Sequence, residues 1–218
     1  MLFLLTGDVQ IGKTRWLESL CASLQAAGTC VAGVVAPGQW VPRPEGQPGG
    51  KHGFDGAGRF EKLGIDNVLL PQGERIEFAR RRDLAAKGKA FAEGTQAKAA
   101  KLGWAISDTA IAQVNAHFAT LAKQAANETR LAPRAVLVVD ELGRLELLRG
   151  CGLTNALAIL DAGPTPQFPH AIAVVRETLL DEARRRFEPR WGKATVIGPD
   201  DAARNLVLET ARAAGGAH

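Results

Sequence analysis

Gly7-Asp8-Val9-Gln10-Ile11-Gly12-Lys13-Thr14 follows directly after the apolar run Leu2-Phe3-Leu4-Leu5. The stretch fits the pattern G-x-x-x-x-G-K-[ST], which indicates a phosphate-binding P-loop when a buried strand precedes it and a helix follows. In such a loop, successive backbone N–H groups and the positive end of the helix hold polyphosphate oxygens. A chance match is the alternative in a chain with 24 glycines. The strand before the loop and the helical spacing after it disfavour that alternative.

The residues of this loop have separable expected roles. Gly7 and Gly12 allow the chain to turn tightly and to approach the phosphates. Lys13 places its ammonium on the β- and γ-phosphates, and Thr14 offers its hydroxyl to Mg²⁺. The remaining expected nucleotide-binding residues lie inside the loop or directly after it: Asp8, Val9, Gln10, Ile11 and Arg15.

The composition fits a single domain over residues 1–218 that binds a small anionic ligand. The net charge is +4, from 27 basic and 23 acidic residues, which suits a nucleotide without requiring nucleic acid. Aromatic residues make up only 6% and are not interleaved with a basic stripe, so nucleic acid is the least favoured partner. The scattered Cys21, Cys30 and Cys151 offer neither a disulfide framework nor a metal site.

The apolar start of the chain stops at Gly7, which is too short for a signal segment or a membrane span. We therefore expect a cytoplasmic protein with no membrane partner.

Apolar runs that read as buried strands alternate with helical patterns along the chain. Ser107 is expected to cap a long helix over residues 108–126. The alternation predicts a three-layer α/β sandwich of the P-loop type, with a mainly parallel central sheet and helices on both faces. The expected strands after the first are 31–36, 135–139, 171–175 and 194–197.

Three segments are expected to lie outside this sandwich. Residues 37–63 are rich in Pro and Gly, which predicts a long loop, and its 37–58 part could contact a protein partner. Residues 64–82 read as an appended β-hairpin around Pro71-Gln72-Gly73-Glu74. Residues 214–218 are expected to form a flexible tail.

The strand over residues 135–139 ends in Asp140-Glu141. A buried strand that ends in an acidic pair is typical of the second nucleotide motif of P-loop enzymes. At the carboxyl end of a central parallel strand, Asp140 would sit beside the P-loop and hold Mg²⁺ with Thr14.

Triphosphate hydrolysis also needs a group that aligns water with the γ-phosphorus, and Glu141 is the candidate. The alternative is that Glu141 is an exposed acid paired with Arg144. Arg144 and Arg176 are both candidates for stabilising the transferred phosphoryl group, and either could equally be a surface cation.

The segment Asp140-Glu141-Leu142-Gly143-Arg144-Leu145-Glu146-Leu147 resembles the D-E-[IL]-G-x-[ML]-E-L motif of the THEP1-type nucleoside-triphosphatases. These are small P-loop proteins that hydrolyse several nucleoside triphosphates with little base preference. The resemblance implies nucleotide binding by the loop, metal binding by Asp140 and water orientation by Glu141. The likeness is greatest to a bacterial THEP1-like branch of unassigned role that is sometimes linked with molybdenum metabolism. Two features depart from the family pattern: the loop interior Asp8-Val9-Gln10-Ile11, where the family usually has small residues, proline or glycine, and the long insert over residues 37–63.

The leading hypothesis is a Mg²⁺-dependent nucleoside-triphosphatase that cleaves the β–γ phosphate bond of ATP, GTP and other nucleoside triphosphates. One alternative is a small-molecule or nucleotide kinase, for which the Arg80-Arg81-Arg82 cluster could form a lid. Another is a nucleotide-dependent switch or accessory ATP-binding protein, with molybdenum metabolism as one setting.

Overall fold

A computed structural model describes residues 1–8, 11–42, 60–82, 91, 93–96, 104–126 and 134–215. For residues 214 and 215 it describes the backbone alone. The strands are β1 (Leu2–Leu5), β2 (Cys30–Val35), β3 (Gly38–Pro42), β4 (Phe60–Leu70), β5 (Glu74–Arg81), β6 (Trp104–Ile106), β7 (Ala135–Leu142), β8 (His170–Val175) and β9 (Thr195–Ile197). The α-helices are α1 (Lys13–Ala26), α4 (Asp108–Ala126), α5 (Arg144–Arg149), α6 (Thr154–Ala162), α7 (Leu180–Trp191) and α8 (Asp201–Gly215), and a 3₁₀ turn, η1, spans Glu177–Leu179.

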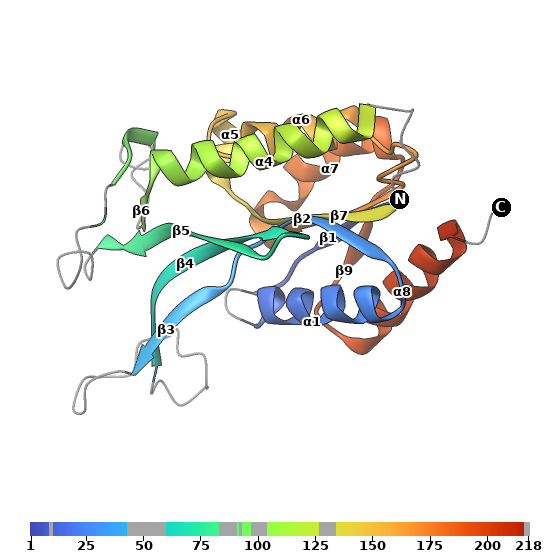
Figure 1. The fold of residues 1–218 in the computed structure, drawn as a ribbon, viewed down its shortest axis with the longest axis horizontal. Coiled ribbons are helices and arrows are strands. Elements are labelled where there is room, and N and C mark those ends of the chain that lie inside the picture. The colour runs from blue at the N-terminus through green and yellow to red at the C-terminus, as the bar shows by residue number, and fades with distance from the viewer. Residues whose placement is uncertain are drawn as a thin grey trace.

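The described strands form one curled, nine-stranded sheet in the order β6-β5-β4-β2-β7-β8-β1-β9, with β3 paired to β4 (Figure 1). From β2 to β9 the pairs are parallel, whereas every pair among β2, β4, β3, β5 and β6 is antiparallel. The expectation of a mainly parallel sheet is therefore wrong, because the sheet is mixed. Within the antiparallel half, β4 and β5 are joined by the short turn over residues 71–73, and a connection of that length cannot make a parallel crossover.

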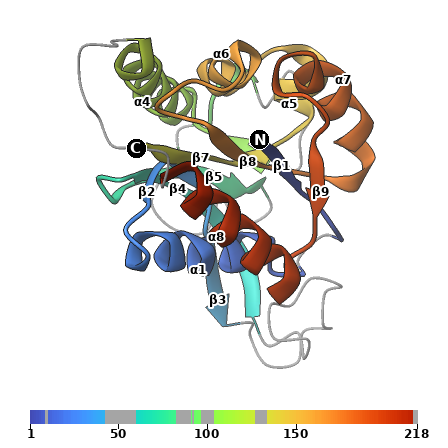
Figure 2. The same cartoon turned by 90° about the vertical axis from the view of Figure 1, so that its right-hand side faces the viewer.

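Alternating side chains of the parallel strands bury two separate apolar faces. Leu137 and Val139 of β7 pack on one side, and Val136 and Val138 pack on the other. Helices α4, α5, α6 and α7 cover the first face, and α1 and α8 cover the second (Figures 1 and 2). Strands that are buried on both faces have continuous apolar runs in the sequence. For this reason these strands could be predicted from the sequence.

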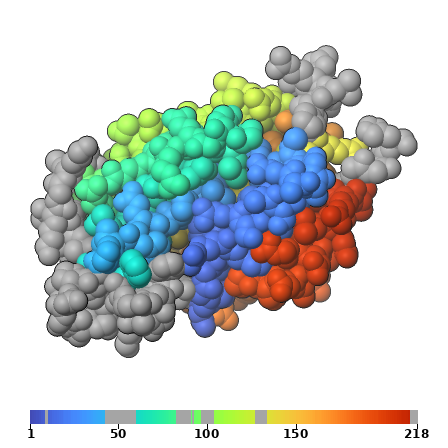
Figure 3. Space-filling view, turned by 60° about the horizontal axis from the view of Figure 1, so that its bottom comes forward, coloured from blue at the N-terminus to red at the C-terminus, as the bar shows by residue number. Residues whose placement is uncertain are grey.

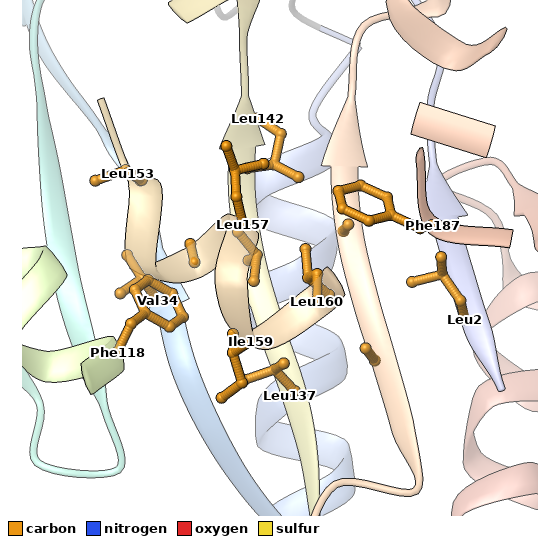
Figure 4. Packing of buried hydrophobic residues seen from close by; sticks show 14 of the residues in the cluster. Leu2, Val34, Phe118, Leu137, Leu142, Leu153, Leu157, Ile159, Leu160 and Phe187 are labelled. Carbon is orange, nitrogen blue, oxygen red and sulfur yellow. The ribbon is translucent and has the colours of Figure 1, made fainter. Parts of the chain in front are cut away.

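The packing on each face is dense. Figure 4 shows Phe118, Leu157, Leu160 and Phe187 of the covering helices in the same apolar cluster as Leu137 of the sheet. On the opposite face α1 and α8 lie against each other (Figure 3). These two layers fix the carboxyl ends of β1, β7 and β8 relative to one another.

The predicted long helix is confirmed as α4. The backbone N–H of Ala110 donates a 3.3 Å hydrogen bond to Oγ of Ser107, so Ser107 caps the first turn. The apolar stripe of this helix is buried at Ile111, Val114 and Phe118.

The predicted loop over residues 37–63 is wrong at both ends. Strand β3 pairs with β4 from Gly38 opposite Ile65 to Pro42 opposite Phe60. Residues 43–59, which include most of the segment expected to contact a partner, lie outside the described part of the chain. Strands β3 and β4 pair through backbone hydrogen bonds. Such bonds do not require an apolar sequence pattern, so the sequence did not indicate these strands.

The hairpin predicted at 64–82 exists as β4 and β5, but it is not an appendage. Strand β4 begins earlier, at Phe60, and its far end pairs with β2, with Gly33 opposite Leu70. The hairpin thus extends the main sheet. The predicted tail at 214–218 also needs correction, since α8 continues to Gly215; residues 216–218 lie outside the described part.

None of the helices in the described ranges is long and apolar enough to cross a membrane.

Candidate functional site

The glycine-rich loop leads from β1 into α1. Gly7 has φ +133° and Gly12, directly before the helix, has φ +94°, conformations that favour glycine. Nζ of Lys13 donates hydrogen bonds to the carbonyl oxygens of Gly7 at 2.7 Å and Asp8 at 2.6 Å. The lysine therefore folds back over the loop. Asp8, Ile11 and Arg15 are exposed, whereas the predicted site residues Val9 and Gln10 lie outside the described ranges.

The charges around Lys13 show which groups share its surroundings. Burial lowers the pKa of Lys13, the charges of Glu141, Asp140 and Asp8 oppose this effect, and the charge of Arg176 reinforces it. The structure thus brings the two acids into electrostatic reach of the loop.

The loop and the acids do not belong to neighbouring strands. Strand β8 lies between β1, which precedes the loop, and β7, which carries the acids. The two motifs meet because parallel strands present their carboxyl ends at the same edge of a sheet.

Asp140 is buried, with 2% of its surface exposed. Its Oδ2 accepts a 2.9 Å hydrogen bond from the backbone N–H of Ala36, and the side chain of Thr14 also interacts with this carboxylate. Burial, followed by the charge of Glu141, raises the pKa of Asp140 to about 7, against the opposing contributions of Ala36, Thr14 and Lys62. The carboxylate therefore carries its charge at a high energetic cost unless a cation compensates it.

Asp140 and Thr14 fit a divalent cation. Oδ1 of Asp140 is buried and has no hydrogen-bond partner within the described ranges. Mg²⁺ in phosphate sites is usually bound by one or two protein oxygen ligands together with water and substrate phosphates. Oδ1 of Asp140 and the hydroxyl of Thr14 would supply two oxygen ligands of this kind.

Glu141 lies in a bulge of β7. The pairing of β7 with β8 shifts register between Val139 and Leu142, and Glu141 has φ +62°, which is uncommon for a residue with a side chain. The bulge turns Glu141 outward, with 46% of its side chain exposed, directly after the buried Asp140. The ion-pair partner of Glu141 is Lys62 of β4, with Nζ 3.9 Å from Oε1. The pairing with Arg144 considered from the sequence does not occur in the described part of the chain.

Lys62 lies beside the candidate site and was not predicted from the sequence. It lies in Glu61-Lys62-Leu63, near the start of β4, where no motif marks it. Its charge also lowers the pKa of Asp140. Only the pairing of β4 with β2 brings it to the edge of the sheet where β7 ends.

The two candidate arginines differ in position. Arg176 directly follows β8, between the loop strand and the acid strand, and its charge acts on Lys13. Arg144 is the exposed first residue of α5, and the described residues give it no hydrogen bond or ion pair with the loop.

The side chain of Glu146 has a structural role in connecting α5 to the segment before α6. Its Oε2 accepts a 2.9 Å hydrogen bond from the N–H of Gly143, and its Oε1 accepts one of 3.1 Å from the N–H of Leu153. The buried carboxylate thus ties the start of α5 to the segment that leads into α6.

Together these elements define a mixed α/β protein in which a glycine-rich loop faces a buried acid across one strand. No protein-family model matches the chain, and no curated protein matches it. Among solved structures, the chain is similar to a human cancer-related nucleoside triphosphatase determined in solution, with a TM-score of 0.53 and 18% sequence identity. The alignment covers 99% of this chain and 96% of the human one. At this identity the similarity establishes a shared fold.

Proposed function

We propose that the protein is a Mg²⁺-dependent nucleoside-triphosphatase that cleaves the β–γ phosphate bond of ATP, GTP and other nucleoside triphosphates. One observation carries the proposal. Oδ1 of the buried Asp140 has no hydrogen-bond partner in the part of the chain that the structure describes, and its carboxylate interacts with Thr14, one residue beyond Lys13 of the glycine-rich loop. A buried acid in this place has a physical reason to exist when a cation and a polyphosphate share the site.

Each of these residues has a separate role in the proposed hydrolysis. Nζ of Lys13, which now contacts two loop carbonyls, turns to the β- and γ-phosphates and offsets their charge. Asp140 and Thr14 would hold Mg²⁺, which when bound would supply positive charge that offsets the charge of the phosphates. Arg176, at the same edge of the sheet, is the better placed of the two arginines to stabilise the transferred phosphoryl group.

Glu141 orients the attacking water and accepts its proton. The water oxygen forms a bond to the γ-phosphorus, while the bond from that phosphorus to the β–γ bridging oxygen breaks. The products are inorganic phosphate and a nucleoside diphosphate.

Two further findings support the proposal. The chain shares its fold with a protein described as a nucleoside triphosphatase. The segment from Asp140 to Leu147 resembles the acidic motif of the THEP1-type enzymes. We extend the proposal to membership of the bacterial THEP1-like branch and to a cytoplasmic location.

The kinase alternative receives no comparable support. Arg80, Arg81 and Arg82 each pair with an acidic side chain of their own surroundings, namely Glu77, Glu61 and Glu93 respectively. Arginines engaged in this way do not favour a phosphate-facing lid.

The proposal is tested by measuring phosphate release from ATP, GTP, CTP and UTP with and without Mg²⁺. We expect release with Mg²⁺ from several of the four, formation of the matching diphosphate, and loss of both after chelation. Lys13→Ala should abolish the activity, whereas Lys123→Ala on the exposed end of α4 should not change it. Wild-type protein that binds a triphosphate but releases no phosphate would overturn the hydrolase assignment.

A further inference from the structure

Glu141, the expected water-orienting acid, is poorly restrained by its own strand. Its side chain is about half exposed, and the bulge of β7 removes it from the regular ladder. Hydrolysis requires the attacking water to be held to within a fraction of an ångström, and small misplacements slow such reactions strongly. The carboxylate therefore needs an external restraint.

Among the described residues, Lys62 forms the ion pair with the Glu141 carboxylate. Nζ of Lys62 lies 3.9 Å from Oε1 of Glu141, and the lysine comes from β4 in the antiparallel half of the sheet. Unlike Glu141, its side chain is only 17% exposed. A mostly buried cation beside a half-exposed acid can define where that acid lies.

The ammonium of Lys62 is itself held in place. It lies 5.6 Å from the centre of the Trp104 ring, a cation–π contact that links it to β6. Its stem passes close to Gly38 of β3, where an added Cβ would lie 2.7 Å from Cε of Lys62 and 2.8 Å from Nε1 of Trp40. The absence of a side chain at Gly38 thus leaves the space through which Lys62 reaches Glu141.

Stability does not explain this arrangement. A partly exposed ion pair contributes little to folding, since solvent screens it and both side chains lose freedom. The contact is therefore more significant for the direction it gives to the Glu141 carboxylate than for the free energy of unfolding.

We propose that Lys62 is a positioning residue that holds the carboxylate of Glu141 over the reacting phosphate, so that the β3–β4 arm forms part of the hydrolytic site. This inference rests on the proposed function and adds to it a residue outside both nucleotide motifs. Lys62 acts through Glu141 and makes no required contact with the nucleotide.

The central test compares Lys62→Met, which keeps most of the aliphatic stem and removes the charge, with Lys62→Arg and the distant control Lys123→Met. We expect Lys62→Met to lower kcat about ten- to a hundredfold, with KM and the affinities for ADP and a non-hydrolysable ATP analogue unchanged. Lys62→Arg should recover most of the loss, and Lys123→Met should match wild type. On a Glu141→Gln background, Lys62→Met should have no additional effect.

A second variant addresses the same contact without removing the lysine. Gly38→Ala should displace the stem of Lys62 and lower kcat at constant KM, with folding checked by thermal unfolding. If Lys62→Met does not fold, Gly38→Ala and Lys62→Arg carry the test.

The outcomes separate the two proposals. Wild-type activity with unchanged kcat in Lys62→Met and Gly38→Ala overturns the positioning role alone. A selective loss of affinity for the ATP analogue over ADP also overturns it, because Lys62 would then contact the γ-phosphate directly. Absence of hydrolysis by the wild type overturns the proposed function, and the positioning role with it.

Discussion

The backbone N–H of Ala36 donates a 2.9 Å hydrogen bond to Oδ2 of Asp140. Ala36 directly follows β2, the strand that pairs with β7 on the side away from β8. One oxygen of the acid is therefore fixed by the sheet itself, and Oδ1 is left without a partner among the described residues. This arrangement orients the carboxylate before any ligand binds, which reduces the cost of assembling a metal site.

Replacement of Glu141 separates nucleotide binding from hydrolysis. We expect Glu141→Gln to keep wild-type affinity for ATP and to lower kcat about 10²- to 10⁴-fold, because the amide cannot accept the proton of water. Titration with a fluorescent nucleotide gives the affinity, and phosphate release gives the rate. Glu209→Gln, on the exposed face of α8, serves as the control. Equal hydrolysis by Glu141→Gln and wild type would remove Glu141 from the mechanism.

The two candidate arginines should give unequal effects. Arg176→Ala is expected to lower kcat by about tenfold or more, since the charge of Arg176 acts on Lys13 of the loop. Arg144→Ala should leave kcat unchanged, because Arg144 faces solvent at the start of α5. Steady-state kinetics with ATP would compare the two variants directly. A larger loss in Arg144→Ala would reverse the assignment.

His117 should make the stability of the protein sensitive to acid. Nε2 of this buried residue on α4 lies 3.1 Å from the carbonyl oxygen of Gly33, so the neutral ring donates its proton there. Burial lowers the pKa of His117 below its ordinary value of 6.5, against the opposing contributions of nearby carbonyls. The pKa of His117 is therefore lower in the folded protein than in the unfolded chain. At pH values between these two pKa values the unfolded chain binds more protons than the folded protein, so the free energy of unfolding falls as the pH drops below 6.5.

The measurement is the urea midpoint of metal-free protein at several pH values from about 7.5 down to about 5. We expect His117→Gln to show a shallower loss of stability over this range than wild type. His170→Gln should also show a shallower loss than wild type, because burial and the charge of the amino terminus lower the pKa of His170. An identical pH dependence in wild type and His117→Gln would contradict the prediction.

Gly33 is required for the close approach of β2 and β7. It has φ +120°, and an added Cβ would lie 1.9 Å from the carbonyl oxygen of Val138. We expect Gly33→Ala to destabilise the protein by about 3 kcal/mol or more, because the strands must separate. Gly73, with φ +76° and open space around it, should lose only about 1 to 2 kcal/mol on the same change. Urea unfolding of both variants checks the difference, and equal losses would show that backbone conformation alone matters.

The acidic motif from Asp140 to Leu147 shows which part of the candidate site the sequence located. Asp140, Glu141 and Glu146 all belong to it, but the structure gives them different surroundings. Asp140 is buried, and its Oδ1 has no hydrogen-bond partner among the residues described. Glu141 is turned outward by a bulge, and Glu146 accepts hydrogen bonds from Gly143 and Leu153. The motif identified the segment, but the position of each carboxylate depended on the backbone.

The sequence by itself determined the strand–loop–helix unit around Lys13, the buried strands of the parallel half and the helix that Ser107 caps. These features depend on local patterns, such as continuous apolar runs, helical periodicity and glycine spacing, which are physical consequences of neighbouring residues. Only the tertiary structure decided that β4 joins β2, that β8 separates the loop from the acids and that Lys62 meets Glu141. Those relationships come from backbone pairing between segments far apart in the chain, and backbone hydrogen bonds carry no residue-specific signal that a single sequence could reveal.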